Sequence, residues 1–270
     1  MIRIHRGVEP AALTTARASE LPRVQALAAT RPPTQDDIGG RYKVAHDALW
    51  NAQHYKCCYC ESREQSKRND VEHFRPKSQA DRRPGSHVDH GYWWLAWTWE
   101  NLLFSCRNCN QYPAKSGKFP LAEGSAVLQQ RQLPPGQERP LLIDPAAESG
   151  IEHIQFVWMP HGVAKTGKWL PRPRNGSRRG AWSIRVCQLD RPDLLDLYGQ
   201  HVEQNVMPMV EDLRVTMRGG SNAGVQRQWS RTLLRLLNPA QLYIGLSHDV
   251  LDHFIPAVVR KKHTLDLRLP

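Results

Sequence analysis

Four of the six cysteines in this chain form two Cys-x-x-Cys pairs, which bracket a stretch of 45 residues. The pairs are Cys57 with Cys60 and Cys106 with Cys109. The short turn within each pair lets two thiolates converge on one metal ion, and four thiolates complete the tetrahedral shell of a structural Zn²⁺ site. Such a site has no open coordination position. The cysteines therefore predict a zinc ion that fixes the fold and takes no part in chemistry.

The other two cysteines, Cys58 and Cys187, lack this pairing and are expected to be buried small hydrophobic residues. In a reducing compartment, Cys-x-x-Cys pairs indicate metal binding rather than disulfides. The segment Met1–Gly7 has no apolar signal sequence, and no apolar run approaches the ~20 residues of a membrane helix. The sequence thus predicts a cytoplasmic protein that does not associate with membranes.

The charge balance favours an anionic polymer as a partner. The chain has 37 Lys and Arg residues against 26 Asp and Glu residues, a net charge of +11. Such an excess indicates nucleic acid first and a membrane surface as a distant second. No acidic residue occurs between His153 and Leu189, where seven basic residues concentrate. Phosphate contact is the expected role of this segment, and a solvated loop is the simpler alternative.

The hydrophobic pattern predicts more helices than strands. Apolar positions recur at helical spacing over 41–55 and again from residue 190 to the end, where Pro208 is expected to kink a helix. Short β-prone runs occur at 71–74 and 151–159. Four tryptophans lie in the seven residues from Trp93 to Trp99, and most of them are expected to pack as core.

An acidic residue and a histidine, Glu72 and His73, lie between the two cysteine pairs, and Asn101 and Asn110 follow them. Oxygen ligands from Glu72 and Asn110 suit Mg²⁺ or Mn²⁺. A neutral His73 beside that cation could accept a proton from water. If a β-hairpin carries the histidine and a helix carries Asn110, these groups can surround one phosphate.

These residues resemble the HNH endonucleases, also called ββα-metal or His-Me finger nucleases, of the zinc-stapled subtype. The resemblance implies that His73 is the general base and that Glu72 and Asn110 bind the catalytic metal. It also implies that Asn101 fixes the loop that holds the base, and that Lys115 is the lysine found beyond the final Cys-Asn pair. Glu72 replaces the more common aspartate, and the spacing to Lys115 is longer than usual.

A closer resemblance, covering about two thirds of the chain, is to the PtuB-type HNH nucleases of Septu and related retron anti-phage systems. It is carried by runs that the sequence shares with that family, Val71-Glu72-His73-Phe74-Arg75-Pro76-Lys77-Ser78, Lys118-Phe119-Pro120-Leu121 and Leu141-Leu142-Ile143-Asp144-Pro145 among them. The resemblance implies a nuclease effector in a hetero-oligomer with an ABC-type ATPase similar to PtuA.

The expected fold class is α+β, with a mostly helical chain around a zinc-stapled ββα-metal module, a small β-containing insertion and C-terminal helices. We expect four parts, an N-terminal arm (1–40), the nuclease module (41–125), a basic extension with short strands (126–189) and a C-terminal helical region (190–270).

The predicted function is metal-dependent cleavage of nucleic acid, with DNA as the favoured substrate. The residues expected to contact nucleic acid are all basic, and they are Arg75, Lys77, Lys115, Arg172, Arg174, Arg178 and Arg179. Two alternatives stay open. One is a non-catalytic, zinc-stapled module that binds nucleic acid or acts as a scaffold, and the other is an effector that cleaves RNA, such as tRNA.

Overall fold

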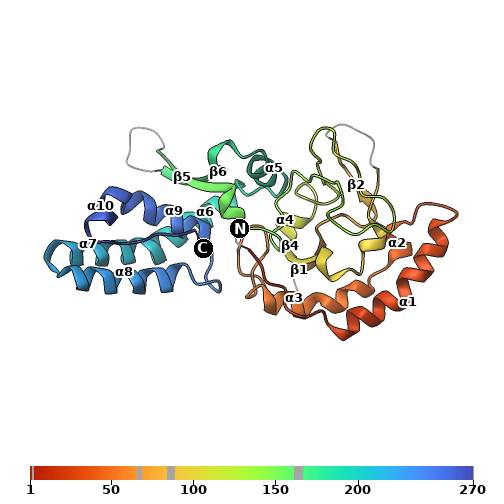
Figure 1. Cartoon of the computed structure of the whole chain (residues 1–270), viewed down its shortest axis with the longest axis horizontal. Coiled ribbons are helices and arrows are strands. Elements are labelled where there is room, and N and C mark those ends of the chain that lie inside the picture. Colours follow the sequence, from red (N-terminus) through yellow and green to blue (C-terminus); the bar gives the residue numbers. More distant parts are fainter. Residues whose placement is uncertain (2, 66–68, 84–88, 161–166, 270) are drawn as a thin grey trace.

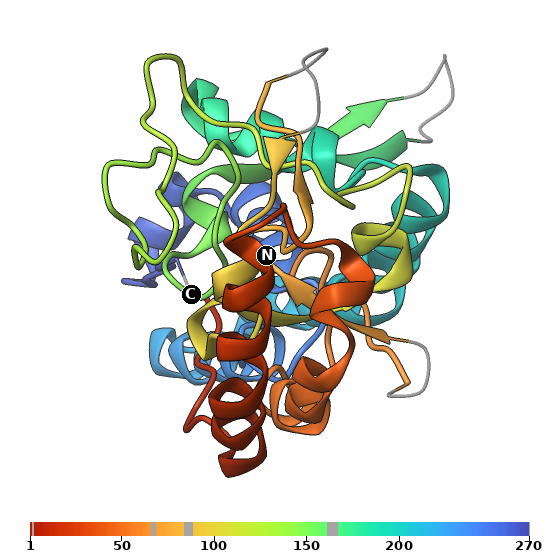
Figure 2. The same ribbon diagram turned by 90° about the vertical axis from the view of Figure 1, so that its right-hand side faces the viewer.

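The computed structural model describes residues 1, 3–65, 69–83, 89–160 and 167–269. The molecule is elongated, with the cysteine-rich region and the N-terminal helices at one end and the C-terminal helices at the other (Figure 1). Viewed from the N-terminal end, α1 (Ala11–Ala28) runs down the front of the molecule (Figure 2). In the described ranges, the strands form three two-stranded antiparallel pairs. This mixed, mainly helical architecture agrees with the predicted α+β class.

The chain is mainly helical before the first cysteine pair. After α1 the chain forms α2 (Gln35–Ile38), a 3₁₀ turn (Arg41–Ala45) and α3 (His46–Ala52). Thr34 and Asp37 cap the start of α2 reciprocally, which satisfies two backbone donors of that short helix. The predicted helix over 41–55 is thus a 3₁₀ turn followed by a shorter α-helix, and Leu49 of α3 is fully buried.

The centre of the cysteine-rich region is a strand pair followed directly by a short helix. The strands are β1 (Asn69–His73) and β4 (Leu102–Cys106), and the helix is α4 (Arg107–Asn110). The antiparallel register places His73 opposite Leu102 and Asn69 opposite Cys106. All five residues of β4 are buried, as expected of an apolar strand inside a core. This pairing brings the histidine, the second cysteine pair and Asn110 into one small region.

The segment between β1 and β4 contains the tryptophan-rich core. It includes the short pair β2 (Gln79–Ala80) and β3 (Asp89–His90), and two 3₁₀ turns (Trp93–Leu95 and Trp99–Asn101). All four tryptophan side chains from Trp93 to Trp99 are buried. The prediction that most of these rings form core is therefore confirmed.

The third strand pair lies between the two ends of the molecule (Figure 1). It consists of β5 (Ile154–Pro160) and β6 (Gly167–Pro173), and α5 (Arg178–Val186) packs near it. Short 3₁₀ turns (Gly150–Glu152 and Arg174–Gly176) flank this pair. The predicted strand at 151–159 is confirmed, although it begins three residues later. Lys165 of the basic segment lies outside the described residues.

The C-terminal region is helical, as predicted. Its elements are α6 (Pro192–His201), a π-helical turn (Val202–Val206), α7 (Met207–Gly219), α8 (Asn222–Leu236), α9 (Ile244–Phe254) and α10 (Ala257–Lys262). The π turn lies just before Pro208, which has no N–H to donate to the preceding helical turn. The helix thus departs from regular α geometry next to Pro208, and the predicted kink stays a prediction. None of the described helices combines the length and the hydropathy that a membrane span requires.

Polar contacts join the C-terminal region to the turn that carries the first cysteine pair. The Lys56 ammonium donates to the backbone oxygen of Gln241 at 2.6 Å. The Glu61 carboxylate accepts the backbone N–H of Ile244 at 2.9 Å and also pairs with the N-terminal ammonium of Met1. Residues on both sides of the first cysteine pair are thereby fixed by segments that are distant in sequence.

Candidate functional site

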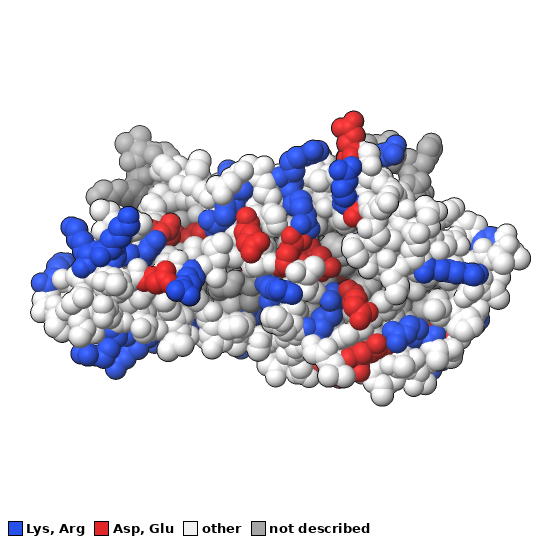
Figure 3. Space-filling model, in the orientation of Figure 1, with Lys and Arg blue, Asp and Glu red and all other residues white. Residues whose placement is uncertain are grey.

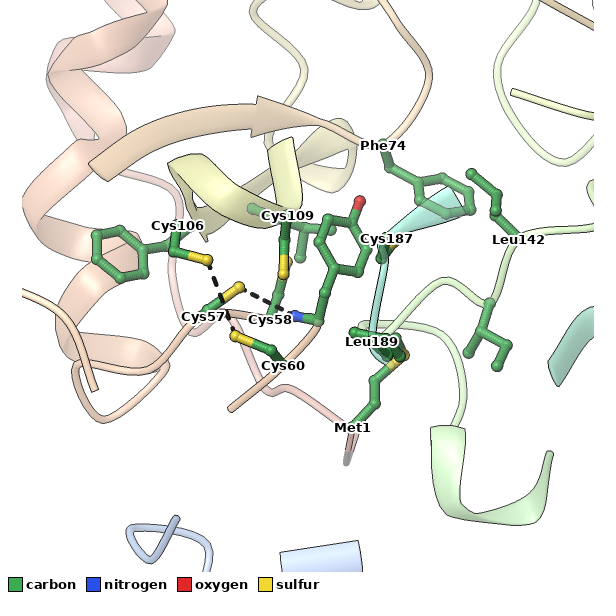
Figure 4. Close-up of a cluster of buried hydrophobic side chains, with 14 of the residues drawn as sticks. Met1, Cys57, Cys58, Cys60, Phe74, Cys106, Cys109, Leu142, Cys187 and Leu189 are labelled. Atoms are coloured by element: carbon green, nitrogen blue, oxygen red, sulfur yellow. Dashed lines mark hydrogen bonds between the residues drawn. The ribbon is translucent and has the colours of Figure 1, made fainter. Parts of the chain in front are cut away.

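The four paired cysteines form one buried cluster. Their sulfur atoms all lie within 4.8 Å of one another, and Figure 4 shows them pointing toward a common centre. The Cys60 and Cys106 sulfurs are 3.8 Å apart. A tetrahedron with zinc–sulfur bonds of about 2.3 Å has edges of about 3.8 Å, so this spacing fits a Zn²⁺ ion. The donor set is therefore suited to structural zinc.

Local structure explains how the sulfurs converge. Cys57 and Cys60 lie on the turn after α3, whereas Cys106 ends β4 and Cys109 lies within α4. The backbone N–H of Tyr59 donates to the Cys57 sulfur at 3.4 Å. Hydrogen bonds with neighbouring cysteines lower the pKa of Cys57 well below its ordinary value, although its burial acts in the opposite direction. Donors of this kind stabilise thiolates and orient them for metal binding.

The two unpaired cysteines lie outside the cluster. Cys58 and Cys187 are both buried, and neither belongs to the group of converging sulfurs. Burial raises the pKa of each thiol, so both stay protonated and unreactive. Their predicted role as small hydrophobic residues is confirmed.

A cleft of about 680 Å³ opens beside the zinc-type cluster and gathers several of the predicted site residues. Glu72, His73, Lys77 and Asn110 all line it. β1 supplies the first two, the loop after β1 supplies the lysine, and α4 supplies the asparagine. The cleft therefore collects a carboxylate, an imidazole, an amide and an ammonium group on one surface.

The His73 ring is held in one orientation by a hydrogen bond to the backbone. Its Nε2 lies 2.9 Å from the carbonyl oxygen of Ala96. Because a carbonyl only accepts, Nε2 carries the proton and Nδ1 is left as an acceptor. The edge of the Tyr42 ring packs against the imidazole at a centroid distance of 4.5 Å. Burial, together with the positive charge of Lys77, lowers the pKa of His73 well below its ordinary value, so the ring is neutral at pH 7.

The Glu72 carboxylate has a buried partner beneath the cleft. Its Oε1 forms an ion pair with the Lys115 ammonium and accepts the Tyr59 hydroxyl at 3.1 Å. The Lys115 ammonium also donates to the backbone oxygen of His73 at 3.0 Å. Burial raises the pKa of the Glu72 carboxyl above its ordinary value, and Lys115 opposes that rise. Both of these contacts use Oε1, so Oε2 is the oxygen left for a further ligand.

The Asn110 side chain donates through Nδ2 to the carboxylate of Asp70 at 3.1 Å, and Gln111 donates to the same oxygen. Asp70 lines the cleft and was not among the predicted site residues. The pattern Asp70-x-Glu72 could have indicated it, because alternate residues of a strand share one face. The amide nitrogen of Asn110 faces Asp70, so its amide oxygen is the atom available to a cation.

Asn101 lies under the cleft rather than in its wall. Its amide oxygen accepts the backbone N–H of Arg75 at 2.8 Å. Its amide nitrogen donates to the backbone oxygens of Arg75 and Leu95, at 3.0 and 3.2 Å. These three bonds hold the loop that follows His73 against the turn before β4.

Four of the basic residues predicted to contact nucleic acid are instead engaged in ion pairs. Lys115 is fully buried and forms an ion pair with Glu72. Arg75 is also buried, and its guanidinium lies 2.8 Å from the Glu138 carboxylate. The other two are Arg174, which pairs with Asp249 at 2.7 Å, and Arg179, which pairs with Glu148. These placements differ from the predicted surface contacts. A charge at low exposure requires an opposite charge, and a sequence read alone does not show which charges become buried.

The remaining predicted contacts keep an accessible position. Arg172 and Arg178 are exposed on the β6 and α5 side of the molecule. Lys77 is half-buried in the wall of the cleft, with its ammonium 5.0 Å from the centre of the Tyr42 ring. Their predicted role in binding nucleic acid stays a prediction.

Comparison with known proteins adds one clear relationship. The chain is 26% identical to the Septu protein PtuB of Bacillus mycoides (strain KBAB4) over 254 residues, which cover 88% of this chain and 81% of that protein. The chain is a homologue of PtuB. No family model and no solved structure matches it.

The PtuB homologue also resembles part of a second Septu protein. A stretch of 147 residues is 32% identical to the Septu protein PtuA of the same strain. The match covers 54% of this PtuB homologue and only 19% of that PtuA. The similarity is thus confined to a minor part of PtuA.

We expect the purified PtuB homologue to contain zinc, and Cys106→Ala to remove it. Loss of a structural zinc should destabilise the fold severely, because zinc binding to such sites contributes about 10–16 kcal/mol. Cys187→Ala is the matched control, since it changes a buried cysteine outside the cluster. Elemental analysis and thermal unfolding measure both effects. Full zinc content in Cys106→Ala would contradict the assignment.

We expect Arg75→Met to lower the free energy of unfolding by about 3 kcal/mol, because the buried Glu138 carboxylate would lose its charged partner. Adding Glu138→Gln should recover part of that loss. Chemical denaturation of the single and double variants measures this coupling. An unchanged unfolding midpoint in Arg75→Met would show that Arg75 serves another purpose.

Proposed function

We propose that this PtuB homologue is a metal-dependent HNH endonuclease that hydrolyses phosphodiester bonds of nucleic acid, with DNA as the favoured substrate. The observation that carries the proposal is the state of His73. A neutral imidazole with its protonated nitrogen bound to a backbone carbonyl faces a cleft that also contains carboxylate and amide groups. A general base requires this combination of a free acceptor nitrogen and a neutral ring.

His73 is proposed to take a proton from the attacking water through Nδ1. The carbonyl oxygen of Ala96 keeps the ring in the tautomer that has Nδ1 free. The same carbonyl stabilises the imidazolium that forms once the proton has moved. Asn101 contributes indirectly, because it fixes the loop that begins after His73.

Glu72 and Asn110 are proposed to hold a divalent cation, Mg²⁺ or Mn²⁺, with Asp70 close to them. Carboxylate and amide oxygens are the ligands that these cations prefer. When bound, the cation neutralises charge on the scissile phosphate and on the leaving oxygen. Lys77, half-buried in the cleft wall, is proposed to bind a phosphate beside it.

The defence role is proposed from the relatives. PtuB and PtuA are both named as Septu proteins, and this chain matches PtuB over most of its length. We propose that it is the nuclease effector of an anti-phage system and acts with an ABC-type ATPase similar to PtuA. Such a partner would restrain an otherwise harmful nuclease.

One observation favours the non-catalytic alternative. The Lys115 ammonium occupies one oxygen of Glu72, and a cation at that carboxylate has to share it with this buried positive charge. A zinc-stapled module that binds nucleic acid without cutting it would have no use for a catalytic metal. Assays of metal-dependent cleavage separate this alternative from the nuclease.

We expect His73→Ala to reduce cleavage of plasmid DNA by about 10²–10⁴-fold or more, the usual contribution of a general base. His46→Ala is the matched control, because His46 lines the same cleft and forms a hydrogen bond with its exposed neighbour Asp47. Assays with Mg²⁺ or Mn²⁺, alone and with the ATPase, measure the effect on DNA and on total RNA. Thermal unfolding checks that both variants fold.

Two results would decide against the nuclease. If His73→Ala cleaves as fast as the unaltered protein, His73 is not the base. If the unaltered protein cleaves neither DNA nor RNA with either metal, in the presence or absence of the ATPase, the non-catalytic binding module is the better account.

A further inference from the structure

Two further cavities lie on the surface near α5 and β6. The first, of about 430 Å³, is next to the cleft in the chain, because Gly117 lines the cleft and the next residue, Lys118, lines this cavity. The second, of about 610 Å³, shares Arg185 and Gln188 with the first and reaches Arg172 on β6. We name these two cavities together the α5 groove. The two cavities of the α5 groove share lining residues with each other, and the groove approaches the cleft at Lys118.

The α5 groove has unpaired positive charge. Arg172 and Arg185 are exposed, and neither forms an ion pair with any residue in the described ranges. The Arg185 guanidinium packs 5.4 Å from the centre of the Trp182 ring. Asp81 and Asp190 also line the groove, and Lys118 adds a further cation. Arg191 lines it too, but it forms an ion pair with Asp193 at 3.2 Å.

These two arginines differ from their neighbours in sequence. Arg174 and Arg179 belong to the same basic segment and are held by carboxylates. The segment therefore divides into arginines that stabilise the fold and arginines that are available to a ligand. An open groove with free guanidinium groups is suited to phosphates in succession along a strand.

Aromatic side chains accompany the cations. Tyr112 is 86% exposed, and it lies in sequence between Gln111 of the cleft and Pro113 of the α5 groove. Trp182 is half-buried and its ring lies against the Arg185 guanidinium, so Tyr112 is the ring that is open to a base. Exposed aromatic rings placed among cations are the surface on which unpaired bases stack. Paired bases in a duplex are already stacked and cannot use such rings.

We infer that the α5 groove binds the single-stranded flank of a nucleic acid whose scissile phosphate lies in the cleft. This inference rests on the proposed nuclease function and adds a substrate class to it. Arg172 and Arg185 bind backbone phosphates, and Tyr112 stacks on a base close to the cleft. DNA and RNA strands share this chemistry, so both are substrates to be compared. In Figure 3, the space-filling view, basic side chains also gather over the C-terminal helices, which provide a control surface away from the groove.

The test measures binding without cleavage, by fluorescence anisotropy in buffer without added divalent cation. The variant Arg172→Ala/Arg185→Ala is compared with Arg227→Ala/Arg235→Ala on α8, where both arginines are exposed and have no ion pair among the described residues. Both double variants lose the same charge. The probes are labelled oligodeoxythymidine, oligouridine and a DNA duplex of equal length.

The groove variant should bind both single strands about tenfold more weakly, and the dependence of log K on log salt should become shallower by about 1.4, because each single-strand phosphate contact contributes about 0.7. The α8 variant should match the unaltered protein. Tyr112→Ala should weaken binding of the single strands by about tenfold and leave the duplex unaffected, because only unpaired bases stack on the ring.

Equal losses in the groove and α8 variants would overturn the inference, since the effect would then be one of net charge. An unchanged affinity in the groove variant would also overturn it, and so would equal effects of Tyr112→Ala on single strands and duplex. Weaker binding in the groove variant, with no cleavage by the unaltered protein, would support strand binding by the α5 groove and contradict the proposed nuclease activity. Normal cleavage by the unaltered protein, with unchanged binding in the groove variant, would support the nuclease activity and contradict strand binding by the groove.

Discussion

The convergence of four sulfurs on one point is the constraint on which the rest of this structure depends. The first cysteine pair lies on a turn after α3, and the second pair spans the end of β4 and the start of α4. Holding both pairs together closes the long insertion between them into a loop. Because β1 pairs with β4, and α4 follows β4 directly, the closure also fixes where His73 and Asn110 stand relative to each other.

The cleft is built on buried polar groups that each have a specific partner. Glu72 forms an ion pair with Lys115, and Arg75 forms one with Glu138. Asn101 accepts a hydrogen bond from the backbone of the loop after His73. Removing such groups from water is costly, and the cost is offset only when their hydrogen bonds are complete. The result is a layer of paired polar groups beneath the cleft, and the hydrogen bond from His73 Nε2 to the Ala96 carbonyl keeps the imidazole in one tautomer.

Which residues come together at the candidate site was largely predictable from sequence, whereas the ion pairs around them were not. The cysteine spacing predicted the converging cluster, and the acidic-His dipeptide with its two asparagines predicted groups that the structure places within or directly beneath one cleft. Asp70 was missed although the pattern Asp70-x-Glu72 places it on the same strand face as Glu72, and only the structure shows that it accepts a hydrogen bond from Asn110. Arg75 and Lys115 were expected to contact nucleic acid, and only the fold shows that they form buried ion pairs with Glu138 and Glu72.

By itself, the sequence predicted the converging cluster of four cysteines, the helical C-terminal region, the strand near residues 151–159 and the buried tryptophans. These features depend on residue spacing and on local backbone chemistry, both of which can be read directly from the sequence. The tertiary structure alone decided which cations form ion pairs with carboxylates and which line the α5 groove without an ion pair among the described residues. Those properties depend on burial and on contacts between residues that are far apart in sequence, and such contacts exist only after the chain has folded.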